Sequence, residues 1–179
     1  MTDDLFAVPG YHTRLVQEKD MGALQVLLEK CNDYMLLVDG HPAGPSAAVT
    51  LISERPDGKA VEDKVVLGIF SSNKELIGVL DAVKDYPRVN DWWIGLLLID
   101  PVYRNQKVGK RVVDSFAKWA SHQGAQWIFL GVVEANENAY RFWRAAGFAE
   151  GVRRPPRQFG SLTHVVITMG RDLSEVKVD

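Results

Sequence analysis

The chain has 179 residues, with 21 lysines and arginines against 23 aspartates and glutamates and a formal net charge of −2. Hydrophobic residues make up 46% and charged residues 25%, as in an ordinary globular domain. The length predicts a single domain, residues 1–179, with a sizeable core. The near-neutral charge gives no electrostatic reason to expect nucleic acid or an anionic membrane as a partner.

Cysteines, histidines and the first residues bear on the compartment and on metals. The single cysteine, Cys31, excludes an internal disulfide framework, and its place on an apolar helix face favours packing over nucleophilic chemistry. The acidic start and the lack of an apolar run of about 20 residues predict a cytoplasmic protein without a membrane span. The histidines show no metal-ligand spacing, so no metal is expected.

The first part of the chain predicts strands and short helices. Residues 11–17 form a strand, and Asp20 can cap the helix that follows. A second short helix covers 45–54, with a proline in its first turn. Residues 64–72 and 75–83 are apolar and β-branched, which predicts a hairpin.

A central strand follows. Residues 92–99 are apolar on both alternating faces, as in a strand that is covered on both sides. Gly95 inside this run marks a bulge. The neighbouring aromatic residues Trp92, Trp93 and Tyr86 could line an apolar acceptor pocket or a dimer contact.

The last part alternates helix and strand. An amphipathic helix over 108–122, a strand over 126–133 and a helix capped by Asn136 are predicted, with Gly147 as a left-handed helix stop. Two strands, at about 148–154 and 163–169, complete the chain. Strands that alternate with helices after a block of hairpins indicate a mixed sheet flanked by helices.

A basic loop joins the central strand to the amphipathic helix. Pro101 ends the strand, and Arg104, Lys107 and Lys110 bring positive charge to the helix start. Unpaired N–H groups and the helix dipole make such a helix start a site for a pyrophosphate. The sequence matches neither a Walker loop nor a dinucleotide fingerprint. An ordinary loop with solvated basic side chains is the alternative interpretation.

The order of residues in this loop has a known counterpart. A strand is followed by Ile99-Asp100-Pro101-Val102-Tyr103-Arg104, and the loop closes with Val108-Gly109. This pattern resembles the acetyl-CoA motif of the GNAT superfamily of acyl-CoA-dependent N-acyltransferases, which has Arg or Gln, two residues, Gly, one residue, and Gly or Ala. Lys107 stands where the first glycine is usual. If that position needs a positive φ, lysine costs roughly 1–2 kcal/mol there, unless its ammonium compensates by meeting a phosphate.

A second block strengthens the resemblance because it is independent and correctly placed. The later helix has the family's spacing of Asn, Ala, an apolar–aromatic pair and Gly-Phe, at Asn136, Ala139, Phe142, Trp143, Gly147 and Phe148. Each residue also has an ordinary explanation as helix cap, core or helix stop. Both blocks together, in order and with a helix and a strand between them, are hard to obtain by chance.

The resemblance implies an α/β (α+β) fold: a GNAT-like mixed, mostly antiparallel, central sheet of six to seven strands flanked by about four helices. It implies acetyl-CoA as co-substrate, with its pantetheine arm paired like an added strand in the gap between two splayed strands. A backbone N–H near Ile99 would polarise the thioester carbonyl. The strand, the loop and the later helix would hold the coenzyme through Leu97, Leu98, Ile99, Arg104, Asn105, Gln106, Lys107, Val108, Gly109, Lys110, Asn136 and Trp143.

The catalytic groups are harder to assign. A primary amine is mostly protonated at pH 7, and its deprotonation costs about 4–5 kcal/mol, so a base or a water relay is needed. Trp143 replaces the tyrosine that often serves the family as an acid, and Gly131 replaces a glutamate found in some members. Asp85 and Glu134 are nearby carboxylates, and the favoured candidates are Asp81, Tyr34 and Tyr140. The ordinary alternatives for these three are an edge or solvent-facing strand residue, a core or interface aromatic and a helix-surface residue, respectively.

We expect an acetyl-CoA-dependent N-acetyltransferase that acts on an amine, in a small molecule or a peptide, by direct transfer through a ternary complex. A homodimer is a habit of the family. The first alternative is a non-catalytic or weakly catalytic acyl-CoA-binding regulatory module. The second is a binder of nucleic acid or an acidic partner, suggested by Arg153-Arg154-Pro155-Pro156-Arg157, although these residues also suit the exposed tip or edge of the last hairpin.

Overall fold

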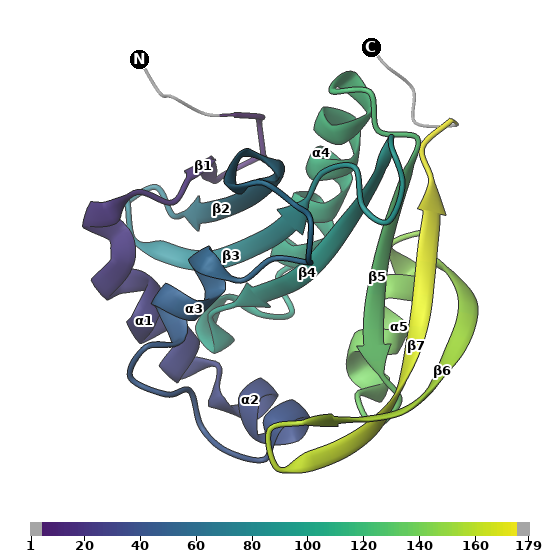
Figure 1. The fold of residues 1–179 in the computed structure, drawn as a ribbon. Helices are drawn as coiled ribbons and strands as arrows, with labels where there is room; N and C mark the ends of the chain where they lie inside the picture. The colour runs from purple at the N-terminus through teal and green to yellow at the C-terminus, as the bar shows by residue number, and fades with distance from the viewer. Residues whose placement is uncertain (1–4, 175–179) are drawn as a thin grey trace.

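A single sheet of seven strands organises the protein in this computed structural model, which describes residues 5–174. The strands are β1 (His12–Leu15), β2 (Lys64–Phe70), β3 (Leu76–Val83), β4 (Asp91–Ile99), β5 (Trp127–Val133), β6 (Ala149–Phe159) and β7 (Leu162–Asp172). They lie in the order β1-β2-β3-β4-β5-β7-β6 (Figure 1). Only β4 and β5 pair in parallel. The predicted mixed, mostly antiparallel sheet is confirmed.

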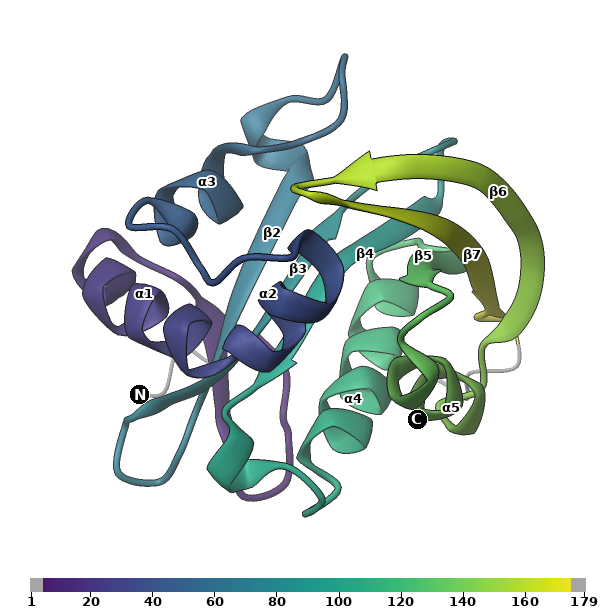
Figure 2. The same ribbon diagram turned by 90° about the horizontal axis from the view of Figure 1, so that it is seen from below.

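Five α-helices cover the two faces of the sheet. They are α1 (Met21–Lys30), α2 (Asn32–Asp39), α3 (Ala47–Ser53), α4 (Val108–His122) and α5 (Glu137–Ala145). The first three lie on one face, and α4 and α5 lie on the other (Figures 1 and 2). Leu24 and Leu28 of α1 are buried against Val66 and Val79 of the sheet, whereas Phe116 of α4 belongs to the core of the opposite face. This double cover explains the apolar character of both faces of β4.

The helix α2 is not evident in the sequence. Cys31 takes a non-helical conformation (φ −93°, ψ 27°) at the end of α1, and the chain resumes as a new helix at Asn32. Cys31 is fully buried, in keeping with the expected packing role. Leu36 and Leu37 remain 50% and 37% exposed. The helix therefore lacks the clear apolar stripe that reveals a core-facing helix in sequence.

The last two strands are longer than predicted. β6 continues through Pro155 and Pro156 to Phe159, because it is an edge strand whose register shifts between Arg154 and Arg157. An edge strand with an irregular register tolerates prolines that cannot donate to the neighbouring strand. The basic Arg-Pro-Pro-Arg segment thus lies within the edge strand rather than at the tip of the hairpin.

Candidate active site

The sheet divides at the centre of β4. Asp81 pairs with Leu96 and Ala82 pairs with Ile94, so Gly95 has no partner on β3, and the predicted bulge is confirmed. On its other side β4 pairs with β5 only as far as Ile94. Beyond this point the two parallel strands separate, and the edge of β4 from Leu96 to Ile99 has no β5 partner. This is the splayed pair that the sequence resemblance implied.

A cavity of about 1030 Å³ occupies the gap. It is lined by the separated ends of β4 and β5, the loop before α4, the first turns of α4 and α5, one side of α2, and β6 and β7. Its volume is at the upper end of the range for small-molecule sites. The expected slot is therefore open.

One end of the cavity is the basic loop before α4. Asn105 and Lys107 both adopt left-handed backbone conformations, each with φ 62°. Lys107 is the residue before α4, and no side chain caps that helix start. The first N–H groups of α4, with the positive end of the helix dipole behind them, are thus presented to the cavity. The positive φ meets the condition under which lysine costs roughly 1–2 kcal/mol.

The first turn of α4 packs directly on α5. A Cβ atom placed on Gly109 would lie 3.3 Å from the ring of Phe142, which is tighter than most side-chain contacts. Gly109 therefore lets the two helix starts approach each other at the cavity. Arg141 of α5 also lines the cavity, so basic side chains border this end from both helices.

Arg104 supports the loop from within. Its Nε donates to the carbonyl oxygen of Ile99 (2.9 Å), and its guanidinium forms a two-point ion pair with the carboxylate of Asp33 on α2. The Arg104 guanidinium holds the pKa of Asp33 below its usual range. The arginine of the motif therefore joins the end of β4 to α2.

Two further contacts fasten the α1–α2 junction to the same strand end. Lys30 Nζ lies 2.7 Å from a carboxylate oxygen of Asp100, and Cys31 Sγ lies 3.6 Å from the carbonyl oxygen of Ile99. Burial raises the pKa of the Cys31 thiol, so this group stays a neutral packing residue. Residues 30–33 as a whole are anchored to the end of β4.

The helix α5 has the features predicted from its motif. The side-chain oxygen of Asn136 accepts a hydrogen bond from the N–H of Ala139 (3.0 Å), which confirms the predicted cap. Trp143 is 7% exposed and packs edge-on against Phe148, with ring centroids 5.1 Å apart. Gly147 has a φ of 88°, as expected for a helix stop.

Aromatic residues surround the other end of the cavity. Tyr34, Trp93 and Phe159 line it from α2, β4 and β6. Burial, with a smaller contribution from the charge of Asp39, raises the pKa of Tyr34 to about 12. Its hydroxyl is therefore protonated at physiological pH and can donate a hydrogen bond.

Of the three aromatic residues considered for an acceptor pocket, Trp93 alone lines the cavity. Trp92 is 3% exposed and packs in the core against Trp119, so its assignment to the pocket is wrong. Tyr86 supports Trp93 edge-on, with ring centroids 6.0 Å apart. Trp92 is buried because α4 covers this face of β4.

Gly131 occupies the β5 position at which some family members carry a glutamate, and neighbouring side chains leave no room for a larger residue there. A Cβ atom on Gly131 would lie 2.9 Å from Val166 Cγ1 and 3.6 Å from Trp93 Cζ2. A longer side chain would collide with Val166 of β7. Glycine at this position is therefore a packing requirement of this chain.

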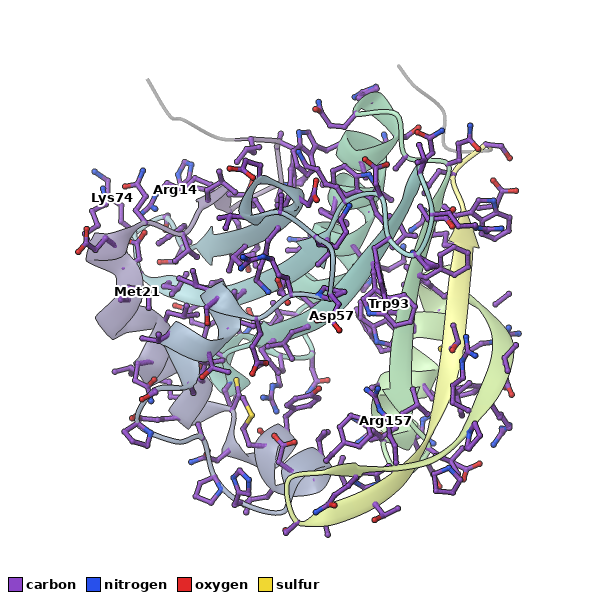
Figure 3. All side chains as sticks on the ribbon, in the orientation of Figure 1. Arg14, Met21, Asp57, Lys74, Trp93 and Arg157 are labelled. Carbon is purple, nitrogen blue, oxygen red and sulfur yellow. The ribbon has the colours of Figure 1, made fainter. Side chains whose placement is uncertain are left out.

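The β6–β7 hairpin closes the cavity against α2. Ser161 at its tip donates its N–H to the carbonyl oxygen of Asp39 (2.8 Å), and His164 Nε2 lies 2.9 Å from the carbonyl oxygen of Val38. Figures 1 and 2 show the hairpin curving across to α2. In Figure 3, Trp93 and Arg157 face the same open space between α2 and β5.

The predicted catalytic residues are separated by the structure. Tyr34 lines the cavity, but Tyr140 and Asp81 do not. The hydroxyl of Tyr140 donates to Glu150 (2.7 Å), and this hydrogen bond turns it away from the cavity. Tyr140 therefore has no geometric basis as a catalytic group.

Asp81 is buried behind the wall of the cavity. Its Oδ2 lies 2.8 Å from the place of a Cβ atom on Gly95, and Gly95 itself lines the cavity. Lys64 Nζ lies 2.9 Å from Oδ1, in a geometry that leaves Oδ1 without a hydrogen bond among residues 5–174. Burial raises the pKa of Asp81, against the opposing effect of Lys64. The solvent-facing alternative for Asp81 is wrong.

All the predicted coenzyme residues except Gln106 line the cavity. The side chain of Gln106 donates instead to the carbonyl oxygen of Val102 (2.9 Å). Further lining residues of α2, α5 and the last hairpin were not predicted; they include Leu37, Val38, Asn138, Arg141, Arg157, Phe159 and Val166. Arg157 and Phe159 alternate on one face of β6, but the alternation does not reveal which face meets the cavity.

Two absences apply to the described part of the chain. Within residues 5–174, no three His, Cys, Asp or Glu side chains are grouped as in a metal site. The helices of this same region are all too short or too polar to cross a membrane.

Parallel strands separate at a bulge, and an uncapped basic helix start stands at one end of the gap, which is the arrangement that the resemblance to an acyl-CoA-binding transferase implied. The sequence profile of the Acetyltransferase (GNAT) family matches residues 29–148, more than half of the chain. The chain belongs to the GNAT family and is an N-acetyltransferase that uses acetyl-CoA.

Solved structures share the fold at low sequence identity. An acetyltransferase from Thermus thermophilus is 22% identical, with a TM-score of 0.74 over 92% of this chain and 98% of that one. Spermidine N-acetyltransferase from Vibrio cholerae, in complex with CoA and spermine, is 13% identical, with a TM-score of 0.75 over 94% and 98%. The ribosomal-protein-S18-alanine N-acetyltransferase from Escherichia coli is 15% identical, with a TM-score of 0.66 over 92% and 94%. No curated protein matches the sequence significantly.

Proposed function

We propose that this protein transfers the acetyl group of acetyl-CoA directly to the amine of a small molecule or peptide, with both substrates bound in one cavity. The observation that carries the proposal is the open gap between β4 and β5. It has a basic helix start at one end and, at the other, an aromatic chamber formed by Tyr34, Trp93 and Phe159. One continuous space can hold both reactants together, and such proximity supplies a large part of the rate.

The residues present fit the coenzyme. The free edge of β4 at Leu97–Ile99 offers backbone groups to the pantetheine amides, and the loop at Asn105–Lys110 offers N–H groups and positive charge to the pyrophosphate. Asn136 and Trp143 border the gap from α5. Acetyl-CoA supplies a thioester carbonyl as the electrophile. In this proposal a backbone N–H near Ile99 polarises it.

The acceptor amine has to lose a proton inside the cavity. Among the described lining residues, Asp33 is the one carboxylate, and Arg104 already neutralises it. Asp81 lies directly behind Gly95, with its Oδ2 2.8 Å from the position of a Cβ atom on that glycine. The proposal places a water molecule at the bulge, between the amine and this carboxylate. We assign Asp81 as the final proton acceptor through such a water molecule, with Lys64 positioning its carboxylate.

Tyr34 serves as a hydrogen-bond donor rather than as an acid. With its pKa raised to about 12, it would give its proton to a thiolate of ordinary pKa, about 8.5, only at a large cost. A neutral hydroxyl in the chamber can still orient the acceptor or the departing sulfur. The fold does not fix the acceptor, since structures that share it are named for substrates as different as spermidine and a ribosomal protein.

A second candidate function is an acyl-CoA-binding module with little turnover. It is favoured by the lack of a directly exposed base in the cavity and by the indole at Trp143 in place of a hydroxyl. One experiment tests the proposed function and separates it from the binding module. Acetyl-CoA at millimolar concentration should raise the melting temperature, and free thiol should appear with members of an amine panel.

The outcomes of this experiment are distinct. No thermal shift would contradict both functions, because both need the coenzyme site. A shift without thiol release for any amine would leave the binding module.

The homodimer and the cytoplasmic location stay predictions, and light scattering of the purified chain tests the first of them.

A further inference from the structure

The three arginines of the last hairpin have different surroundings. Arg153 is ion-paired with Glu134 and Glu150 on the outer surface. Arg154 is exposed and does not line the cavity. Arg157, three residues further along β6, lines the aromatic end of the cavity (Figure 3). Only Arg157 can therefore reach an acceptor inside the chamber.

Arg157 is held in place by an aromatic ring rather than by a carboxylate. Its guanidinium carbon lies 4.4 Å from the ring centroid of Phe159. A guanidinium that stacks on an aromatic face keeps its N–H groups free at the edge of its plane. These N–H groups form a fork that matches a carboxylate or a similar oxyanion.

The charges that line the cavity give this arginine a distinct role. Lys107, Lys110 and Arg141 stand at the coenzyme end, where phosphates are to be neutralised. Asp33, the one carboxylate among the described lining residues, is neutralised by Arg104. Among the described residues that line the chamber of Tyr34, Trp93 and Phe159, Arg157 is therefore the one charge without an ion pair. Asp39, whose charge acts on Tyr34, lies outside this lining.

From this we infer that the acceptor is a primary amine that also carries an acidic group, such as a carboxylate, on an apolar body, and that Arg157 binds the acidic group. The inference deepens the proposed function and rests on it. An amino acid has this chemistry. A polyamine does not, because its positive charges would meet Arg157 without any free carboxylate in the described lining to receive them.

The test compares amines that carry an acidic group with amines that lack one. Thiol release is measured with acetyl-CoA for L-phenylalanine, its amide, phenethylamine and spermidine, and for two further pairs of aliphatic amino acids and their amides. We expect the acids to be turned over with higher kcat/KM than their amides. In Arg157→Gln the ratio of kcat/KM for acid over amide should fall about 10- to 100-fold, the range for a lost hydrogen bond to a charged group.

Arg154→Gln is the matched control, because it removes an exposed arginine from the same strand. It should keep the wild-type ratio. The shift in melting temperature caused by acetyl-CoA should be equal in the wild type and in both variants, which keeps coenzyme binding apart from acceptor binding. Loss of that shift in Arg157→Gln would overturn the inference, since Arg157 would then bind the coenzyme.

The remaining outcomes also decide the question. Preference for spermidine or for the amides in the wild type would overturn the inference while leaving the proposed acetyltransfer intact. If no acid is turned over, calorimetry with the same acids in the presence of CoA replaces the rate assay, and the lack of binding would overturn it. No thermal shift with acetyl-CoA in the wild type would be a failure of the proposed function instead.

Discussion

The two ends of the cavity are built in different ways. The coenzyme end comes from two compact stretches of sequence, 96–110 and 136–148, that lie next to each other around the starts of α4 and α5. The acceptor end brings together Tyr34, Trp93 and Arg157, which are more than 50 residues apart in sequence. The coenzyme end is thus a local motif on a helix start, whereas the acceptor end depends on how α2 and the last hairpin meet.

The largest effect on stability is expected behind the wall of the cavity, at the buried pair of Lys64 and Asp81. Asp81→Ala should lower the free energy of unfolding by about 3–5 kcal/mol, because it leaves the Lys64 ammonium buried without its counter-ion. Urea unfolding followed by fluorescence measures this. A loss below about 1 kcal/mol would show that Lys64 is solvated by other means.

A double variant separates the structural role of Asp81 from its proposed catalytic role. Lys64→Met with Asp81→Leu removes both charges and should recover most of the stability. Its kcat at pH 7 should still be about 100-fold lower if Asp81 receives the proton. A folded double variant with the wild-type rate would contradict that assignment.

The pH profile distinguishes the two roles considered for Tyr34. Because its pKa is raised to about 12, its hydroxyl stays protonated below that pH. Log kcat/KM should therefore rise by about one for each pH unit below the pKa of the acceptor amine, without a falling limb from Tyr34. Tyr34→Phe should lower the profile threefold to tenfold without changing its shape. A falling limb between pH 8 and 10 that the variant loses would show that Tyr34 acts as an acid.

The link between the two ends is expected to have a smaller effect. Arg104→Lys loses the two-point pair with Asp33 and the hydrogen bond to Ile99, so the Kd for acetyl-CoA should rise about five- to tenfold. Asp33→Asn keeps the contact with Ile99 and should mainly raise the acceptor KM. Calorimetry and steady-state kinetics check these effects. Equal changes in both variants would mean that the ends are not separable.

The smallest effect concerns the left-handed lysine of the loop. Lys107→Gly should stabilise the fold by about 0.5–1 kcal/mol, because glycine accepts a φ of 62° without strain but has a more flexible unfolded chain. It should weaken acetyl-CoA binding a few-fold by removing one charge. Lys107→Asn tolerates the same φ and also lacks the charge, so it is the matched control. Unchanged binding in both variants would exclude a contact between Lys107 and a phosphate.

The sequence predicted the coenzyme end because each signal there is local. The cap at Asn136, the stop at Gly147 and the bulge at Gly95 follow from backbone rules that neighbouring residues decide. The position of Gln106 in the loop predicts a coenzyme contact, whereas its hydrogen bond to Val102 does not follow from the pattern.

The acceptor end could not be predicted because its contacts are non-local. The helix α2 faces a cavity, so its apolar residues lack the periodicity that core packing imposes. The place of Tyr140 on α5 predicts a role at the site, but a hydrogen bond to Glu150 on β6 determines the direction of its side chain. The position of Arg157 depends on a register shift in β6. Each of these depends on a partner distant in sequence.

The tip of the last hairpin meets α2 so closely that neither side has room for a side chain. A Cβ atom on Gly160 would lie 2.3 Å from the carbonyl oxygen of Asp39, and one on Gly40 would lie 2.2 Å from Ser161 Oγ. The hairpin and the end of α2 must therefore change together. Attempts to redesign this enzyme for new acceptors by exchanging the hairpin alone should give misfitted junctions, and the unit to exchange is the hairpin with residues 32–41.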